Sequence, residues 1–105
     1  MPKSIINFGS LNLDHVYGVL DFVQPGETLA SHDYKQFVGG KGLNQSIALA
    51  RAGADVFHVG CIGKEGALLK KTLEENNVNV ANVIEIDAPS GHAIIQVNAR
   101  GENCI

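Results

Sequence analysis

The amino-acid sequence predicts an α/β fold in which a mostly parallel sheet with flanking helices is accompanied by a small separate sheet. Strand-like and helix-like stretches alternate along residues 43–86, the order that produces parallel strands joined by right-handed crossovers. Residues 55–62 are apolar on both faces, as in a parallel strand covered on two sides. Residues 16–38 and 92–105 interrupt the alternation with extended stretches, so we expect them to form the separate sheet.

The first half of the chain predicts a strand, two extended arms and a helix. Residues 4–9 are a short apolar run that ends in glycine, which is typical of a buried strand. Residues 16–23 and 28–38 are the extended arms, and the Gln-Pro-Gly-Glu sequence at 24–27 predicts a turn between them. Residues 43–52 follow a helical pattern.

Gly53 fits the position that follows the C-terminus of the helix predicted over 43–52. The expected buried stripe of this helix is Leu43, Ile47, Ala50 and Ala54, with Ala48 beside it. The second half predicts a strand at 55–62, a tight loop at 63–66 and a helix at 67–76, in which Leu69 and Leu73 are one turn apart. A strand at 83–86 follows. The last element is a hairpin of 92–97 and 102–105 around the turn 98–101.

Composition limits the classes of function. The chain has 105 residues, enough for one domain, and a formal net charge of −3 without a basic block, which argues against nucleic acid or an anionic membrane as partner. No apolar run approaches the ~20 residues of a membrane span, and residues 1–7 lack a signal-peptide pattern, so we interpret the chain as cytoplasmic. Cys61 and Cys104 lack metal-site spacing and are expected to be reduced thiols in or near a core.

The segment Phe37-Val-Gly-Gly-Lys-Gly-Leu-Asn-Gln-Ser46 is the strongest functional signal. Gly39, Gly40, Lys41 and Gly42 lie between a strand pattern and a helix pattern, where glycine permits close approach to a ligand and the helix start offers free N–H groups. Asn44 adds an amide in the first helical turn. The spacing matches neither a P-loop nor the dinucleotide fingerprint. We expect a pocket for a small polar or anionic ligand; the alternative is a glycine-rich turn without a ligand.

A second signal is Gly9-Ser-Leu-Asn12-Leu-Asp14, which follows the first predicted strand. In an extended segment, the spacing of Asn12 and Asp14 directs both side chains to one face. A carboxylate that accepts hydrogen bonds and an amide that donates and accepts them suit vicinal hydroxyls. The alternative is a loop in which Asn12 and Asp14 cap their own backbone.

Together these segments resemble the ribokinase family of PfkB-type sugar kinases, from about residue 5 to residue 105. The matching motifs are Gly9-Ser10-x-Asn12-x-Asp14, Pro25-Gly26-Glu27-Thr28, Gly39-Gly40-Lys41-Gly42-x-Asn44-Gln45, Ala52-Gly53-Ala54 and Gly101-Glu102-Asn103. The turn at 63–66 departs from the family pattern, because it is two residues shorter and has Glu where the family has Asp.

The resemblance implies the N-terminal, sugar-binding portion of a ribokinase-like domain spanning residues 1–105. In this interpretation Asn12, Asp14 and Asn44 bind sugar hydroxyls, and Gly39, Gly40 and Lys41 close around the sugar. The stretches at about 16–38 and 92–105 would form a β lid, which in the family often serves as a homodimer interface. The implied parent reaction is phosphorylation of D-ribose by ATP to ribose 5-phosphate.

The resemblance also implies that the catalytic and nucleotide-binding part is missing. The family's catalytic base lies in a C-terminal Gly-Ala-Gly-Asp-like motif that has no counterpart here, so no catalytic, cofactor-binding or metal-binding residue is assigned. ATP, Mg²⁺ and a monovalent cation are expected cofactors of the parent enzyme. Residues 102–105 resemble the start of a returning strand, so we expect a truncated product that is inactive alone. The alternatives are a non-catalytic sugar-binding or dimerisation module, and a kinase of the same fold acting on another sugar or a nucleoside.

The histidines carry weaker expectations. His58 lies in an apolar strand pattern and is expected to be a hydrogen-bonded core or edge residue rather than a catalyst. His15 follows Asp14 and has, as a minor alternative, a place at the rim of the pocket.

Overall fold

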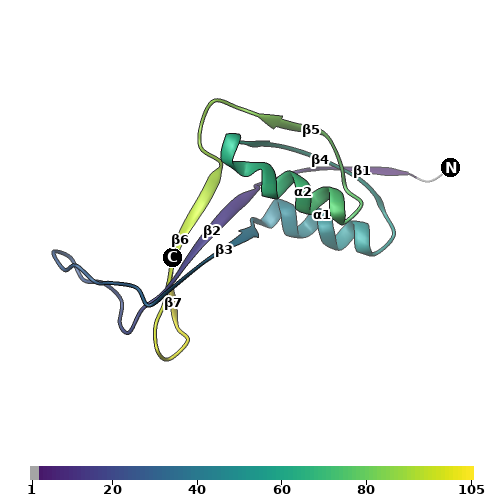
Figure 1. Ribbon diagram of the computed structural model, residues 1–105. Coiled ribbons are helices and arrows are strands. Elements are labelled where there is room, and N and C mark those ends of the chain that lie inside the picture. Colours follow the sequence, from purple (N-terminus) through teal and green to yellow (C-terminus); the bar gives the residue numbers. More distant parts are fainter. Residues whose placement is uncertain (1–2) are drawn as a thin grey trace. The chain divides into compact units, whose positions relative to one another are not determined.

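The computed structural model describes residues 3–105, which divide into two units, each with its own sheet (Figure 1). The first unit contains the described residues up to 13 together with 38–91. The second contains residues 14–37 and 92–105. The separate small sheet that the sequence predicts at 16–38 and 92–105 therefore exists, and its role as a lid stays a prediction.

The sheet of the first unit is wholly parallel, as predicted. Its strands are β1 (Ser4–Phe8), β4 (Asp55–Ile62) and β5 (Asn79–Glu85), in the order β1-β4-β5. The register places Ser4 opposite Asp55 at the start of the β1–β4 pair. The prediction that 55–62 is a parallel strand is confirmed, and β4 is the central strand. The prediction that it is covered on two sides is confirmed for one face only, because both helices lie on the same side of the sheet within the described residues (Figure 1).

Both predicted helices are present, and they lie on one face of this sheet (Figure 1). Helix α1 (Lys41–Arg51) begins two residues earlier than predicted, and Gly53 follows its C-terminus with a φ of 95°, the conformation for which glycine is suited. The predicted loop at 63–66 contains the short 3₁₀ helix η1 (Lys64–Gly66), which leads directly into α2 (Ala67–Glu75). Within residues 3–105, no helix has both the length and the apolar character needed to cross a bilayer.

The core of the first unit lies between these helices and the sheet. Its buried members are Leu11, Leu13, Leu43, Val56, Ile62, Leu69, Leu73, Val78 and Val83. The predicted burial of Leu43, Leu69 and Leu73 is confirmed. The predicted stripe of α1 needs one correction: Ala48 is exposed and Ser46 is fully buried, because Ser46 lies one turn after Leu43 on the sheet-facing side.

The opposite face of the parallel sheet is exposed within the described residues. Phe8 of β1 and Ile84 of β5 are 75% and 58% exposed. The prediction that residues 4–9 form a buried strand is therefore wrong for this face, because both helices cover the other one. The expected burial of the thiols is also wrong: Cys61, which lies on the uncovered face of β4, and Cys104 are both free and exposed.

The sheet of the second unit has four strands in the order β3-β2-β6-β7. These are β2 (Asn12–Gly18), β3 (Asp33–Gly39), β6 (Gly91–Val97) and β7 (Asn103–Cys104). The last two pair antiparallel, which confirms the predicted hairpin.

The extended arms are shorter and shifted relative to the prediction, which placed strands at 16–23 and 28–38. Strand β2 ends at Gly18, whose carbonyl accepts a hydrogen bond from the His32 amide, and regular strand structure resumes only at Asp33. Between them, the predicted turn at 24–27 is present: the Glu27 amide donates to the Gln24 carbonyl at 2.9 Å. Alternating side chains indicated extended backbone but did not determine where pairing stops, because pairing depends on the neighbouring strand.

Candidate functional site

Two segments that are distant in sequence meet at the glycine-rich start of α1. A Cβ atom placed on Gly42 would lie 2.3 Å from the carbonyl carbon of Gly9, and one placed on Gly40 would lie 2.6 Å from the carbonyl oxygen of Ser10. Gly40 also has a φ of 101°, which L side chains rarely adopt. The exit of β1 and the entrance of α1 are therefore in backbone contact, and the contact requires glycine.

A hydrogen bond joins the two segments: the Leu43 amide donates to the Ser10 carbonyl at 3.0 Å. The Asn44 amide donates to the Gly40 carbonyl at 3.0 Å, which is the first hydrogen bond of α1 itself. Gly40, at the N-cap position of α1, provides no side-chain cap. The first turn of a helix has N–H groups without intrahelical acceptors and the positive end of the helix dipole, so this end of α1 is suited to an oxygen-rich ligand.

Asn12, the first residue of β2, belongs to the same place. Its backbone nitrogen would lie 3.2 Å from a Cβ on Gly40. Its side chain is half-buried and packs against Gly91, where a Cβ would lie 2.3 Å from the Asn12 Oδ1. The structure thus brings Asn12 to the predicted glycine segment, although 27 residues separate it from Gly39 (39 − 12).

The remaining predicted site residues differ in exposure. Gly39 is buried, whereas the Lys41 and Asn44 side chains are exposed. Asn44 faces a cavity of about 380 Å³, which is lined by Val38, Leu43, Asn44, Ile47, Ala48, Arg51, Thr72 and Asn76. Lys41 is exposed at the N-terminal end of α1, which leaves its ammonium group available to a ligand.

Asp14 lies in β2, two residues after Asn12, and is half-buried. It belongs to the second unit, whereas the glycine segment from Gly39 to Gly42 belongs to the first. The convergence of the Asp14 carboxylate with that segment therefore stays a prediction.

A buried polar network beneath the glycine contact was missed by sequence reasoning. Asn7 of β1, Ser46 of α1 and His58 of β4 form hydrogen bonds that end on Gly42 and Gly9. The expectation that His58 is a hydrogen-bonded core histidine is confirmed, because it is fully buried and both ring nitrogens are bonded. The signal that could have found the network is the presence of an amide and an imidazole within otherwise apolar strands.

Burial lowers the pKa of His58, because the charged imidazolium is disfavoured in an apolar surrounding. The hydrogen bond between its ring and the Gly9 carbonyl acts in the opposite direction and offsets part of this effect. The neutral imidazole is therefore the form that fits this position.

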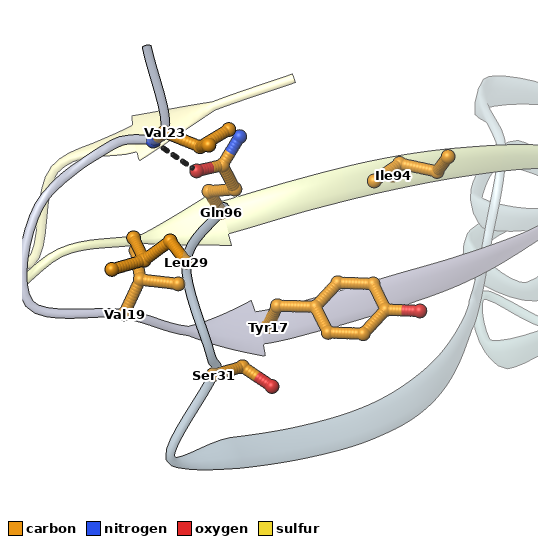
Figure 2. A pocket seen from close by; sticks show the side chains of 7 residues that line it. All are labelled: Tyr17, Val19, Val23, Leu29, Ser31, Ile94 and Gln96. Atoms are coloured by element: carbon orange, nitrogen blue, oxygen red, sulfur yellow. Dashed lines mark hydrogen bonds between the residues drawn. The ribbon is translucent and has the colours of Figure 1, made fainter. Parts of the chain in front are cut away.

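The second unit has a hollow of its own, of about 270 Å³ (Figure 2). It is lined by Tyr17, Val19, Val23, Leu29, Ser31, Ile94 and Gln96, none of which was predicted as a site residue. Gln96 spans part of it by accepting a hydrogen bond from the Val23 amide at 3.0 Å. His15, the alternative rim residue, shares a hydrogen bond of 2.8 Å with the Tyr34 hydroxyl in this unit.

Two observations concern metal and nucleotide binding. Among residues 3–105, no group of three His, Cys, Asp or Glu side chains is arranged to hold a metal ion. The glycine segment also lacks the spacing of a nucleotide-binding loop.

Comparison with known proteins shows the class to which the chain belongs. The profile of the pfkB family carbohydrate kinases matches residues 2–105, so the chain belongs to this family. The ribokinase of Haemophilus influenzae is 38% identical over 108 residues, an alignment that covers 100% of this chain and 35% of that enzyme. The chain thus spans about a third of the length of the curated relatives it matches.

Solved structures confirm the predicted ribokinase-like fold. The ribokinase of Cryptococcus neoformans var. grubii serotype A in complex with ADP superposes with a TM-score of 0.89 at 37% identity, covering 99% of this chain and 33% of that one. Arabidopsis thaliana ribokinase complexed with ribose and ATP gives a TM-score of 0.87 at 27% identity, with 99% and 35% covered.

Proposed function

We propose that this chain is the sugar-binding and lid part of an ATP-dependent carbohydrate kinase that phosphorylates D-ribose to ribose 5-phosphate. The observation that carries the proposal is the backbone contact between Gly9-Ser10 and Gly40-Gly42, with Asn12 beside it. The backbone of Asn12 lies beside Gly40 at the N-terminus of α1, and its amide side chain packs against Gly91. An amide both donates and accepts hydrogen bonds and is therefore suited to hydroxyl oxygens. The relatives named above make ribose the first substrate to test.

In this proposal, each predicted residue has a role in holding the sugar. Asp14 accepts hydrogen bonds from ring hydroxyls, since a carboxylate is an acceptor only, and Asn12 both donates and accepts. Asn44 and Lys41 contribute donors from the first turn of α1. The Gly39 and Gly40 backbone closes around the sugar, and glycine is needed at position 40 because a Cβ there would meet the Ser10 carbonyl oxygen.

The chemical step requires parts that this chain does not provide. Phosphoryl transfer needs a nucleotide, Mg²⁺ and a base that orients the acceptor hydroxyl, and ATP supplies the phosphoryl group. We place these groups, and a monovalent cation, in the remaining two thirds of the parent enzyme. The 105-residue chain alone is accordingly expected to bind sugar without turnover, in the cytoplasm where ATP is available. Turnover by the purified chain with ribose, ATP and Mg²⁺ would contradict this placement.

The role of Asp14 can be tested in a complete kinase in which residues 1–105 replace the matching third of Haemophilus influenzae ribokinase. Asp14→Ala removes a charged acceptor from the sugar, so kcat/KM for ribose should fall about 100-fold. Steady-state kinetics with varied ribose measure this effect.

The matched control is Asp21→Ala, which removes an exposed aspartate from the same unit. It should leave kcat/KM within about twofold of the parent value. If Asp14→Ala behaves like Asp21→Ala while both proteins are folded, Asp14 does not bind the sugar.

The lid strands are also proposed as a homodimer interface. Tyr34, Phe37 and Ile94 of β3 and β6 are 49%, 52% and 62% exposed, which is an unusual amount of apolar surface for a small four-stranded sheet. A second copy of the chain would cover such side chains. Sedimentation equilibrium should therefore show a dimer, and a monomer at all concentrations would contradict the proposal.

The same geometry is compatible with a different acceptor, because vicinal hydroxyls also occur in other sugars and in nucleosides. Comparing kcat/KM for ribose, fructose and a nucleoside in the assembled kinase separates these substrates. A preference for the nucleoside would replace ribose in the proposal and would leave the roles of Asn12 and Asp14 in place.

A further inference from the structure

Three polar side chains from three different elements are buried together beneath the glycine contact. Asn7 of β1 is 9% exposed, and Ser46 of α1 and His58 of β4 are fully buried. Burying an amide, a hydroxyl and an imidazole is costly unless each is hydrogen-bonded. Among the described residues, no buried side-chain nitrogen or oxygen lacks a partner.

The hydrogen bonds of this network run in one direction. The Asn7 Nδ2 donates to the Gly42 carbonyl at 3.0 Å and to the Ser46 Oγ at 2.9 Å. The Ser46 hydroxyl is then free to donate to the His58 Nδ1, 2.7 Å away, and the His58 Nε2–H donates to the Gly9 carbonyl at 3.1 Å. The pattern assigns His58 as the neutral tautomer with its proton on Nε2.

Both ends of the network are carbonyl groups of the touching glycines. Gly42 and Gly9 are the residues between which no side chain fits. The network therefore connects the exit of β1, the first turn of α1 and the central strand β4 at the point where the candidate site is built.

We propose that Asn7, Ser46 and His58 are positioning residues, which set the spacing between the Gly9-Ser10 turn and the first turn of α1 and thereby the geometry in which sugar hydroxyls are held. This inference rests on the proposed function for its sugar-binding consequence. The positioning of the two backbone segments can be tested without a sugar.

An energetic argument favours a role of the network in positioning the backbone over a role in overall stability. Apolar side chains of similar shape could fill the same space with little loss of stability. A connected set of directional bonds, in contrast, is satisfied in one arrangement of its donors and acceptors only. The network therefore holds the Gly9 and Gly42 carbonyls at fixed positions. Apolar packing has no directional bonds and would fix these positions less specifically.

The first experiment measures amide hydrogen exchange in the 105-residue chain. Ser46→Ala removes the middle of the network, so the Leu43 amide, which donates to the Ser10 carbonyl, should exchange about tenfold faster relative to the amide of Leu73, a core residue within α2. Val78→Ala is the control, because it removes apolar bulk from the same core without touching the network. It should accelerate both amides together and leave their ratio unchanged.

A pair of variants at His58 tests the direction of the bonds. His58→Leu keeps the volume and removes both hydrogen bonds, whereas His58→Gln retains an amide that can donate to the Gly9 carbonyl. Gln should therefore restore most of the Leu43 protection that Leu loses. Nitrogen NMR shifts of the His58 ring should show the neutral Nε2–H tautomer, and a charged ring or an Nδ1–H tautomer at neutral pH would overturn the assigned network.

The second experiment titrates ribose into the same proteins. Ser46→Ala and His58→Leu should weaken ribose binding about tenfold, and Val78→Ala and His58→Gln should not. If the exchange ratio changes as expected but the parent chain binds no ribose, the proposed function fails and the positioning role stands. If neither Ser46→Ala nor His58→Leu changes the ratio, or if Val78→Ala changes it equally, the positioning role is wrong. If Ser46→Ala does not fold, His58→Leu and His58→Gln test the positioning role instead, and equal exchange ratios in these two variants would show that it is wrong.

Discussion

The two units bury apolar side chains to very different extents. The first unit has nine buried core side chains between its parallel sheet and helices α1 and α2. In the described part of the second unit, Val19 is the buried apolar side chain, at 4% exposure, while Phe37 and Ile94 are more than half exposed.

This difference teaches which parts of the candidate site are held firmly. Buried apolar area is the main source of folding free energy, so the first unit has its own stabilising core. A sheet with little buried area depends on strand pairing, which is marginal without a packed face. The glycine contact and Asn12 belong to the well-packed unit, and Asp14 belongs to the other.

The largest expected effect tests the core of the first unit. Leu73→Ala removes a fully buried side chain of α2 and should lower the free energy of unfolding by about 3 kcal/mol. Leu20→Ala, at a position that is 68% exposed in the second unit, should change it by less than about 0.5 kcal/mol. Urea denaturation of the 105-residue chain measures both. Equal losses would show that the two units do not differ in the way that burial indicates.

An intermediate effect on the free energy of unfolding is expected from a change of pH, because the first unit contains the buried histidine His58. Because burial lowers the pKa of His58 below the value of about 6.5 found in unfolded chains, the unfolded chain takes up the proton first as pH falls. The contribution of His58 to stability is therefore complete above about pH 6.5 and is lost as pH falls from there towards the folded-state pKa. One proton gives a slope of at most about 1.4 kcal/mol per pH unit.

Urea denaturation between about pH 7.5 and pH 5.5 measures this slope, and His58→Gln is the control. The variant retains His15, His32 and His92, so the difference between the two slopes belongs to His58. A variant whose slope equals that of the parent chain would show that His58 is not held neutral by burial.

The smallest effect concerns the exposed face of the second unit. If a second copy covers Ile94, Ile94→Ala removes about 1 kcal/mol or more of apolar burial from the dimer and should weaken self-association about fivefold to tenfold. Sedimentation equilibrium measures this change. Lys35→Ala, at an exposed position of β3, is a polar control that should have little effect. Unchanged association of the Ile94 variant would place the interface elsewhere.

The sequence predicted the first unit better than the second. Strand β4 and both helices were located to within two residues, because apolar periodicity, Gly53 and the loop glycines are local signals. The arms of the second unit were misplaced, since the end of β2 at Gly18 and the start of β3 at Asp33 depend on pairing with other strands. The exposure of Phe8 and Cys61 was missed, because an apolar sequence does not say which face a helix covers.

The candidate site likewise combines features that the sequence indicated with features that only the folded structure showed. The close backbone approach at Gly40 and Gly42 could be expected from the sequence, since only glycine lacks the Cβ atom that would prevent it. The assignment of Asn12 and Asn44 to hydroxyl binding rests on side-chain chemistry and stays a prediction. Ser46 was not recognisable, because a serine in a helix has no evident partner until the chain has folded. Asn7, an amide within an apolar strand pattern, was a signal, but its partners Gly42 and Ser46 became evident only in the folded chain.

By itself, the sequence determined the alternation of strands and helices, the membership in the pfkB family and the residue types of the candidate site, because these depend on local propensity and on side-chain chemistry. Only the tertiary structure decided that Gly9 touches Gly42, that one sheet face is covered and the other is not, and that three buried polar groups meet beneath the contact. These contacts join residues that are between 12 positions apart, as for Ser46 and His58, and 49 positions apart, as for Gly9 and His58, and contacts over such separations are a property of packing.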